Sequence, residues 1–133
     1  MNLQTLPNSL FPTERFTLLE HTQSQGEKRA TPAFKFLDQS TGKSFWLEVK
    51  TCFHDWTNYI HWCTEVQLRK YLSCHKKTPT FLLLGVQDNA NPSHSVYLLS
   101  MTQARHTYLL DACISHFQVS TNQPLTSAEL WKR

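Results

Sequence analysis

Alternation of apolar and polar positions predicts a β-hairpin in the first half of the chain. Segment 34–37 reads Phe-Lys-Phe-Leu and segment 45–50 reads Phe-Trp-Leu-Glu-Val-Lys, with a run of turn formers between them at 38–42. Successive side chains point to opposite faces of a strand. The second segment therefore has an apolar face of odd-numbered residues, and Glu48 and Lys50 share the other face.

Two registers of this hairpin are open. If Phe34 faces Leu47, the apolar face is continuous and Ala33 lies directly across from Glu48. A tighter turn would leave Ala33 diagonal to Glu48, with the backbones still about 7 to 8 Å apart. Asp38 lies at the turn end in both registers, so we do not expect it to share an ion with Glu48.

The remaining pattern predicts one long helix and three further strands. Thr64 and Gln67 have the spacing of a capping box, so a helix begins near residue 65 and ends at about residue 74, just before the basic residues and the proline at 76–79. Strands are expected at 16–20, at 81–86 as an interior strand covered on both faces, and at 95–101 antiparallel to 81–86. Two C-terminal segments are shorter: 107–117 fits a helix or a strand, and 127–131 a terminal turn of helix.

This order of elements predicts a single domain spanning residues 1–133. A hairpin, a helix and two more strands make a small mixed sheet with a right-handed crossover helix, of class α/β or α+β. No apolar run approaches the ~18 residues of a membrane-spanning helix, and the N-terminus lacks the pattern of a secretory signal. We therefore expect a soluble cytoplasmic protein with no membrane partner.

Cysteine spacing and net charge narrow the functional classes only a little. The four cysteines contain no CxxC pair, which disfavours a disulfide scaffold or a zinc ribbon. Thirteen basic and ten acidic residues give a net charge of +3. This leans toward a polyanionic partner such as nucleic acid, although a solvated basic face explains the same count.

Three short motifs resemble those of the PD-(D/E)XK nuclease superfamily. They are Thr31-Pro32-Ala33-Phe34, Glu48-Val49-Lys50, and Gln67-Leu68-Arg69-Lys70-Tyr71, which looks like the QxxxY motif on the helix after the catalytic strand. The resemblance covers roughly residues 16 to 101. It implies a restriction endonuclease-like fold, in which helices flank a mixed central sheet.

By this resemblance, the chain would hydrolyse phosphodiester bonds of nucleic acid with Mg²⁺ or Mn²⁺, DNA being preferred by family association. Glu48 would be a metal ligand and Val49 would offer its backbone carbonyl to the metal. Lys50 would orient the attacking water or stabilise the charged transition state. Gln67 would assist catalysis, although it equally well completes the capping box with Thr64.

Three further residues are candidates for substrate binding: Lys35, Trp46 and Tyr71. Trp46 shares a face with Glu48, where it would stack on a base or simply cover the sheet. Tyr71 lies four residues after Gln67 on one helical face, where it would contact substrate, pack against the sheet, or do both.

Position 33 departs from the family pattern. Members carry an aspartate after the proline, whereas this chain has Ala33, whose methyl group cannot coordinate a metal. Either the chain is a naturally degenerate member or it carries an inactivating substitution. Retention of Glu48, Lys50, Gln67 and Tyr71 favours the substitution, and we expect the chain to cut poorly or not at all.

Two alternatives to a nuclease are open. The first is a nucleic-acid-binding or protein-assembly module that kept the fold and lost the chemistry. The second is a protein-interaction domain whose exposed tryptophans bind a partner. A homodimer or a larger assembly fits each of these hypotheses, and no sequence feature identifies the interface.

Overall fold

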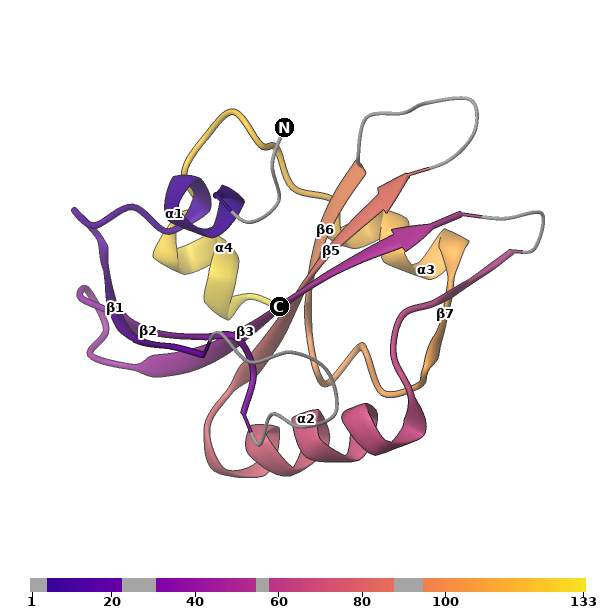
Figure 1. Cartoon of the computed structure of the whole chain (residues 1–133). Helices are drawn as coiled ribbons and strands as arrows, with labels where there is room; N and C mark the ends of the chain where they lie inside the picture. The colour runs from indigo at the N-terminus through magenta and orange to yellow at the C-terminus, as the bar shows by residue number, and fades with distance from the viewer. Residues whose placement is uncertain (1–4, 23–30, 55–57, 88–94) are drawn as a thin grey trace.

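The computed structural model describes residues 5–22, 31–54, 58–87 and 95–133. Figure 1 shows a twisted sheet with helices on both of its sides. In chain order the elements are α1 (Leu6–Leu10), β1 (Phe16–His21), β2 (Phe34–Asp38), β3 (Ser44–Phe53), β4 (Tyr59–His61), α2 (Glu65–Lys77), β5 (Thr80–Gln87), β6 (Ser95–Ser100), β7 (Tyr108–Leu110), α3 (Asp111–Ile114), a 3₁₀ turn (Ser115–Phe117) and α4 (Ser127–Trp131).

The main sheet has five strands in the order β1-β2-β3-β5-β6. β3 and β5 are parallel, and the other neighbours are antiparallel. α2 lies in the crossover between the two parallel strands, as the sequence predicted, and β4 pairs with β7 in a separate two-stranded sheet. The predicted mixed α+β class is therefore confirmed.

Each face of the main sheet carries its own hydrophobic core. The first core lies under α1 and α4 and includes Leu10, Phe36, Phe45, Leu83 and Leu130. The second core lies under α2 and the β4–β7 pair and includes Ile60, Leu68, Tyr71, Leu82 and Leu109. β5 is buried along almost its whole length because its side chains enter both cores, as expected of an interior strand.

The β2–β3 hairpin has the first of the two predicted registers. Phe34 pairs with Leu47 and Phe36 with Phe45, so the register with the tighter turn is wrong. The turn closes through hydrogen bonds from the Asp38 N–H to the Lys43 carbonyl and from the Gly42 N–H to the Asp38 carbonyl, both 2.8 Å. Gly42 has a φ of +73°, in the left-handed region that glycine adopts without strain.

Helix α2 begins at the predicted capping box. The Gln67 N–H donates to the Thr64 hydroxyl, and the Thr64 N–H donates to the Gln67 side-chain oxygen. The helix extends through Lys77, three residues beyond its predicted end, because basic residues in the last turn favour a helix C-terminus. Right after the helix, the Pro79 carbonyl accepts from the Trp46 N–H at 2.8 Å, so the end of α2 lies beside the start of β3.

The other predicted elements are found with small changes of length. β1 and β6 lie where strands were expected, and α4 is the predicted terminal helix. Segment 107–117 contains both candidate structures, since β7 is followed directly by α3. Within the ranges that the structure describes, no helix has the length and apolarity needed to cross a membrane.

Candidate functional site

Glu48 and Lys50 lie on the α2 side of β3, as alternation predicted. Val49, between them, packs against the first core, so the two charged side chains point to the face that holds the second core. Glu48 is only 1% exposed and Lys50 is half-buried. The Val49 N–H donates to the Glu48 carboxylate at 3.0 Å. A carboxylate this well shielded from water depends on such hydrogen bonds.

Cys63 links this pair to the start of α2. Burial is the main cause that raises the pKa of the Cys63 thiol to about 12, and the Lys50 ammonium opposes it. The Glu65, Cys52 and Glu48 groups raise that pKa further. Both charges of the candidate pair thus act on the segment entering α2. The C-terminal end of α2 lies beside Trp46, at the start of β3. α2 therefore runs antiparallel to β3, and Glu48 lies along β3 between Trp46 and the residues near the start of α2.

Ala33 does not take the position predicted for it. The β2–β3 ladder ends at the Phe34–Leu47 pair, so the expected pair between Ala33 and Glu48 is not formed. Ala33 precedes β2 in a bend, and its carbonyl accepts from the Thr22 N–H at 2.7 Å. Its half-buried methyl group packs against the first core. The physical reason is that the bend at Ala33 breaks the alternation of the strand, so its Cα–Cβ bond faces the first core.

Among the described residues, β2 pairs with β3 only as far as Leu47, the residue before Glu48. β3 runs from Ser44 to Phe53, but only its residues from Ser44 to Leu47 pair with β2. On the other side, β3 stays paired with β5 from Trp46 to Phe53. Main-chain groups of β3 beyond Leu47 that point toward β2 therefore have no β2 partner. Val49, whose backbone carbonyl was expected to bind the metal, lies in this segment.

Gln67 and Tyr71 lie on the buried face of α2 and have structural contacts. The Gln67 side-chain oxygen accepts from the Thr64 N–H at 3.1 Å, so it completes the capping box. The Tyr71 ring stacks on Trp62, with ring centroids 5.6 Å apart and planes 16° apart. The packing alternative for each residue is thus realised. Their predicted roles in catalysis and substrate binding stay predictions.

Lys35 and Trp46 form a cross-strand pair at the start of β3. The Lys35 ammonium lies 5.1 Å from the centre of the Trp46 ring, a cation–π distance, and 3.9 Å from the Glu20 carboxylate. Trp46 is 8% exposed. Stacking of a base on the Trp46 face covered by Lys35 would require that lysine to move.

The tryptophans do not support the protein-interaction alternative in the form predicted. Trp46 and Trp62 are buried, and Trp131 is half-buried against the first core. Trp56 lies outside the described residues. The expectation of exposed tryptophans is therefore wrong for these three, because Trp62 and Trp131 pack in the two cores and Trp46 is covered beside Lys35.

Asp38 occupies the opposite side of the sheet from Glu48, which confirms that the two carboxylates cannot share an ion. Ser127 and the Trp131 indole donate to one Asp38 oxygen, and the Ser40 N–H and hydroxyl donate to the other. Burial opposes the charge, but the hydrogen bonds from Ser127, Trp131 and Ser40 outweigh burial and lower the pKa of Asp38 to about 2. Asp38 thus joins β2 to α4.

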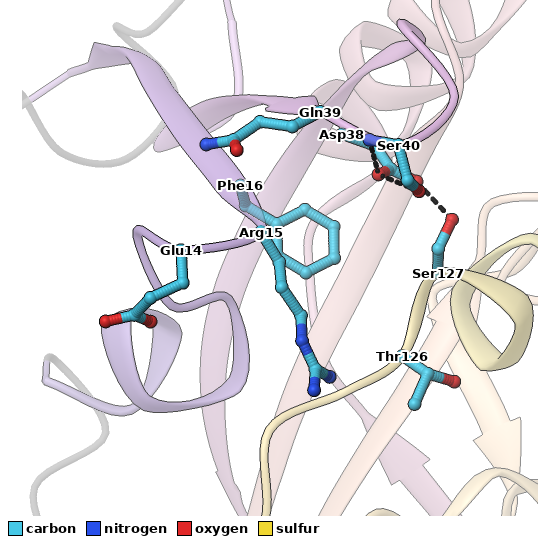
Figure 2. Close-up of a pocket in the computed structure, with 8 residues that line it drawn as sticks. All are labelled: Glu14, Arg15, Phe16, Asp38, Gln39, Ser40, Thr126 and Ser127. Atoms are coloured by element: carbon cyan, nitrogen blue, oxygen red, sulfur yellow. Dashed lines mark hydrogen bonds between the residues drawn. The ribbon is translucent and has the colours of Figure 1, made fainter.

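A cavity of about 500 Å³ opens beside Asp38 (Figure 2). Arg15 extends along it toward Thr126, whereas Glu14 points away. The Asp38 carboxylate itself is engaged with α4 and Ser40, so it has a structural role at this cavity. Residues from 14–16, 38–40 and 126–127 line the space.

A second cavity, of about 450 Å³, lies on the same side of the sheet as Glu48, and the sequence reasoning missed it. It lies between the start of β3 and the second half of α2, and we call it the α2 groove. Its lining residues are Thr31, Trp46, Lys70, Ser73, Cys74, Lys77 and Thr78. Lys70 on the predicted helix and Lys77 just after its predicted end were the signal that could have revealed it.

The residues present do not fit a resident divalent cation. Glu48 is one carboxylate, and no group of three His, Cys, Asp or Glu side chains suited to a metal gathers among the described residues. Mg²⁺ is bound by one or two carboxylates together with water and substrate phosphates, and needs open coordination positions that a 1% exposed carboxylate does not offer. In comparisons with known proteins, no family model matches the chain, and no curated protein or solved structure matches it significantly.

Proposed function

We propose that this chain has the architecture of a metal-dependent nucleic-acid hydrolase, of the PD-(D/E)XK type, whose catalytic centre is incomplete at position 33. The observation that carries the proposal is the pairing of a buried Glu48 with Lys50 on one face of β3, beside the start of α2. A buried carboxylate and a nearby ammonium cost free energy to desolvate, so a fold keeps them where they serve a purpose.

The hairpin supports the same proposal. The β2–β3 ladder ends at the Phe34–Leu47 pair, so position 33 and Glu48 each lie one residue beyond the last paired position of their strands. An aspartate at position 33 would avoid the first core, because burying an unpaired carboxylate there is costly. The accessible alternative is the Glu48 side of the hairpin, where two carboxylates would together attract Mg²⁺ or Mn²⁺.

Each remaining residue has a definable part in hydrolysis. With an aspartate at position 33, a divalent ion held beside Glu48 would supply the activated water and neutralise charge on the phosphate. Lys50 carries a positive charge two residues from Glu48 on the same face, suited to a phosphate oxygen or to the attacking water. Gln67 fixes the first turn of α2, which borders the site. Nucleic acid is the substrate class proposed, with DNA before RNA.

Restoring the missing carboxylate tests the proposal. Ala33→Asp should cleave labelled DNA with Mg²⁺ or Mn²⁺ at least about 10-fold faster than the unmodified chain, which should show little or no cleavage. Ala33→Asn is the matched control, because it has the same size without a charge. Adding Glu48→Gln to Ala33→Asp should abolish the gain.

Folding must be checked alongside the cleavage assay. Circular dichroism and a thermal melt would show whether each variant retains the native structure. A folded Ala33→Asp protein that cuts neither DNA nor RNA, single- or double-stranded, with either metal would contradict the hydrolase proposal. Cleavage by Ala33→Asn equal to that by Ala33→Asp would contradict it too.

A second candidate, a nucleic-acid-binding module without hydrolysis, is favoured by the packing of Ala33 against the first core and by the shielding of Glu48. This candidate predicts salt-sensitive binding that divalent metal and Ala33→Asp leave unchanged. Binding measured with Mg²⁺ and with EDTA separates the two: only the hydrolase architecture predicts metal-enhanced binding by Ala33→Asp.

A further inference from the structure

The α2 groove has the shape and the charge of a binding site. It holds about 450 Å³, within the range of pockets that take small ligands. Among the described residues that line it, two are lysines and none is an aspartate or a glutamate. Trp46 adds an indole on the β3 side, with the Lys35 ammonium next to it. An anionic ligand with flat apolar parts fits this lining.

Helix geometry sets the spacing of the charges. Lys70, Cys74 and Lys77 follow one another at intervals of four and three residues, so they share one face of α2. Seven residues of helix rise about 10.5 Å. The two ammonium groups can therefore reach phosphates on the order of three nucleotides apart, at ~3.4 Å of rise per nucleotide in one strand.

The same row of residues leads from the groove to the candidate site. Gln67 lies one turn before Lys70 on α2, and Trp46 lies two residues before Glu48 on the same face of β3. A strand lying in the groove would thus have one end directed at Glu48. The C-terminal end of a helix repels anions, but His75, Lys76 and Lys77 in the last turn provide positive charge against this effect.

We propose that the α2 groove binds the phosphate backbone of a single nucleic-acid strand, with Lys70 and Lys77 on the phosphates and Trp46 beside a base or sugar. The proposal rests on nucleic acid being the substrate class, and it adds where and in what form the substrate lies. A single strand is proposed because a groove of about 450 Å³ matches one or two nucleotides, and a single strand can turn a base toward Trp46.

The direct test compares two double variants of one helix. Lys70→Gln/Lys77→Gln removes both charges from the groove, and Arg69→Gln/Lys76→Gln removes two exposed charges of the same helix and the same spacing that do not line it. Fluorescence anisotropy with a labelled single-stranded oligonucleotide at 0.1 M salt measures Kd. The groove pair should weaken binding by about 25-fold, since each phosphate contact adds about 0.7 to the logarithmic salt dependence.

The salt dependence of binding provides a second readout. The slope of log Kd against log salt should fall by about 1.4 for the groove pair, which loses two phosphate contacts. The control pair should change Kd by about 3-fold or less, because exposed charges farther from the strand are screened. Equal effects of the two pairs, or a duplex bound as tightly as the single strand, would overturn the groove proposal.

Thiol protection tests the location without any substitution. Cys74 lines the groove and is half-buried, whereas Cys113 on α3 is exposed and outside it. Burial raises the pKa of Cys74, so alkylation is best followed at pH 8.5 by mass spectrometry. Bound oligonucleotide should slow alkylation of Cys74 and leave Cys113 unchanged.

The results of these experiments distinguish failure of the groove proposal from failure of the proposed function. Nucleic-acid binding with unprotected Cys74, and with no difference between the two double variants, would reject the groove alone. Absence of any binding to single- or double-stranded DNA or RNA at low salt would reject the groove together with the proposed function. Protection of Cys74 together with selective loss of binding in Lys70→Gln/Lys77→Gln would support the groove proposal.

Discussion

Replacing Asp38 by asparagine should weaken the attachment of helix α4 to the hairpin. One Asp38 oxygen accepts from Ser127 and from the Trp131 indole at 2.7 Å, and the other accepts from the Ser40 N–H and hydroxyl at 3.0 and 2.9 Å. An asparagine has one acceptor oxygen and one donor NH₂ group. Whichever way the amide is turned, the N–H of Trp131 or of Ser40 loses its acceptor.

The pKa of Asp38 gives the magnitude of the expected loss of folding free energy. Its value is lowered from 3.8 to about 2, and at 1.36 kcal/mol per pKa unit this corresponds to about 2.5 kcal/mol of folding free energy at neutral pH. Asp38 is only 1% exposed but lines an open cavity, so solvent screening makes this figure an upper value. The hydrogen bonds that asparagine cannot make are the same ones that lower the pKa, so the two contributions are not added together. The N–H group left without an acceptor sets the upper end of the range, and Asp38→Asn should cost about 2.5 to 4 kcal/mol.

The dependence on pH has a definite sign. The carboxyl of Asp38 has a lower pKa in the folded state than in the unfolded state. Its contribution is therefore fully present above pH 3.8, and it is lost as the pH falls toward 2. The difference in unfolding free energy between the unmodified chain and Asp38→Asn should be constant from pH 5 to 7 and should shrink below pH 4.

Urea unfolding followed by circular dichroism and tryptophan fluorescence measures both quantities. Asp111→Asn is the matched control, because Asp111 is half-exposed and pairs with His54 at 3.3 Å on the surface. This control should cost less than about 1 kcal/mol. A cost below 1 kcal/mol for Asp38→Asn at pH 7, or a cost that does not shrink between pH 4 and pH 2, would refute the reasoning.

Three further predictions concern the first core, α2 and the thiols. Thr64→Ala should lower the free energy of unfolding by about 1 kcal/mol, since the capping box with Gln67 is lost, whereas Thr64→Ser should retain most of it; equal stability of both variants in urea would contradict this. Leu83→Ala should cost about 2 to 5 kcal/mol by the same measurement, because its side chain is fully buried, and a cost below 1 kcal/mol would show that the core collapses around it. At pH 8, exposed Cys113 should be alkylated while Cys63, whose pKa burial raises to about 12, reacts only after unfolding; early labelling of Cys63 in a mass-spectrometric time course would be the contrary result.

The sequence predicted best where the local pattern and the tertiary contacts agree. Phe34, Phe36, Phe45 and Leu47 alternate with polar residues, and the continuous apolar face that they form requires a single register. The capping box predicted the start of α2 because the two bonds that stabilise it lie within four residues. The end of α2 was predicted three residues too early, since the helix continues where its last turn borders Trp46 and Pro79.

Features that depend on residues far apart in the sequence could not be predicted. The role of Asp38 comes from Ser127 and Trp131, about ninety positions later, and no local pattern indicates that contact. The α2 groove likewise requires the end of a helix and the start of a strand to be set side by side. The helix and the strand were both predicted, the helix three residues too short, but the space between them arises only from packing.

Position 33 lies where alternation no longer assigns a face. Alternation assigns faces only within a paired strand, and Ala33 lies just before β2, in a bend where its carbonyl accepts from the Thr22 N–H. The backbone fixes the direction of the Cα–Cβ bond of an alanine, and at this bend the methyl group packs against the first core. An aspartate on the same backbone would direct its carboxylate toward that core, where an unpaired charge is costly. Ala33→Asp is therefore expected to shift the backbone at the bend as well as to add a charge.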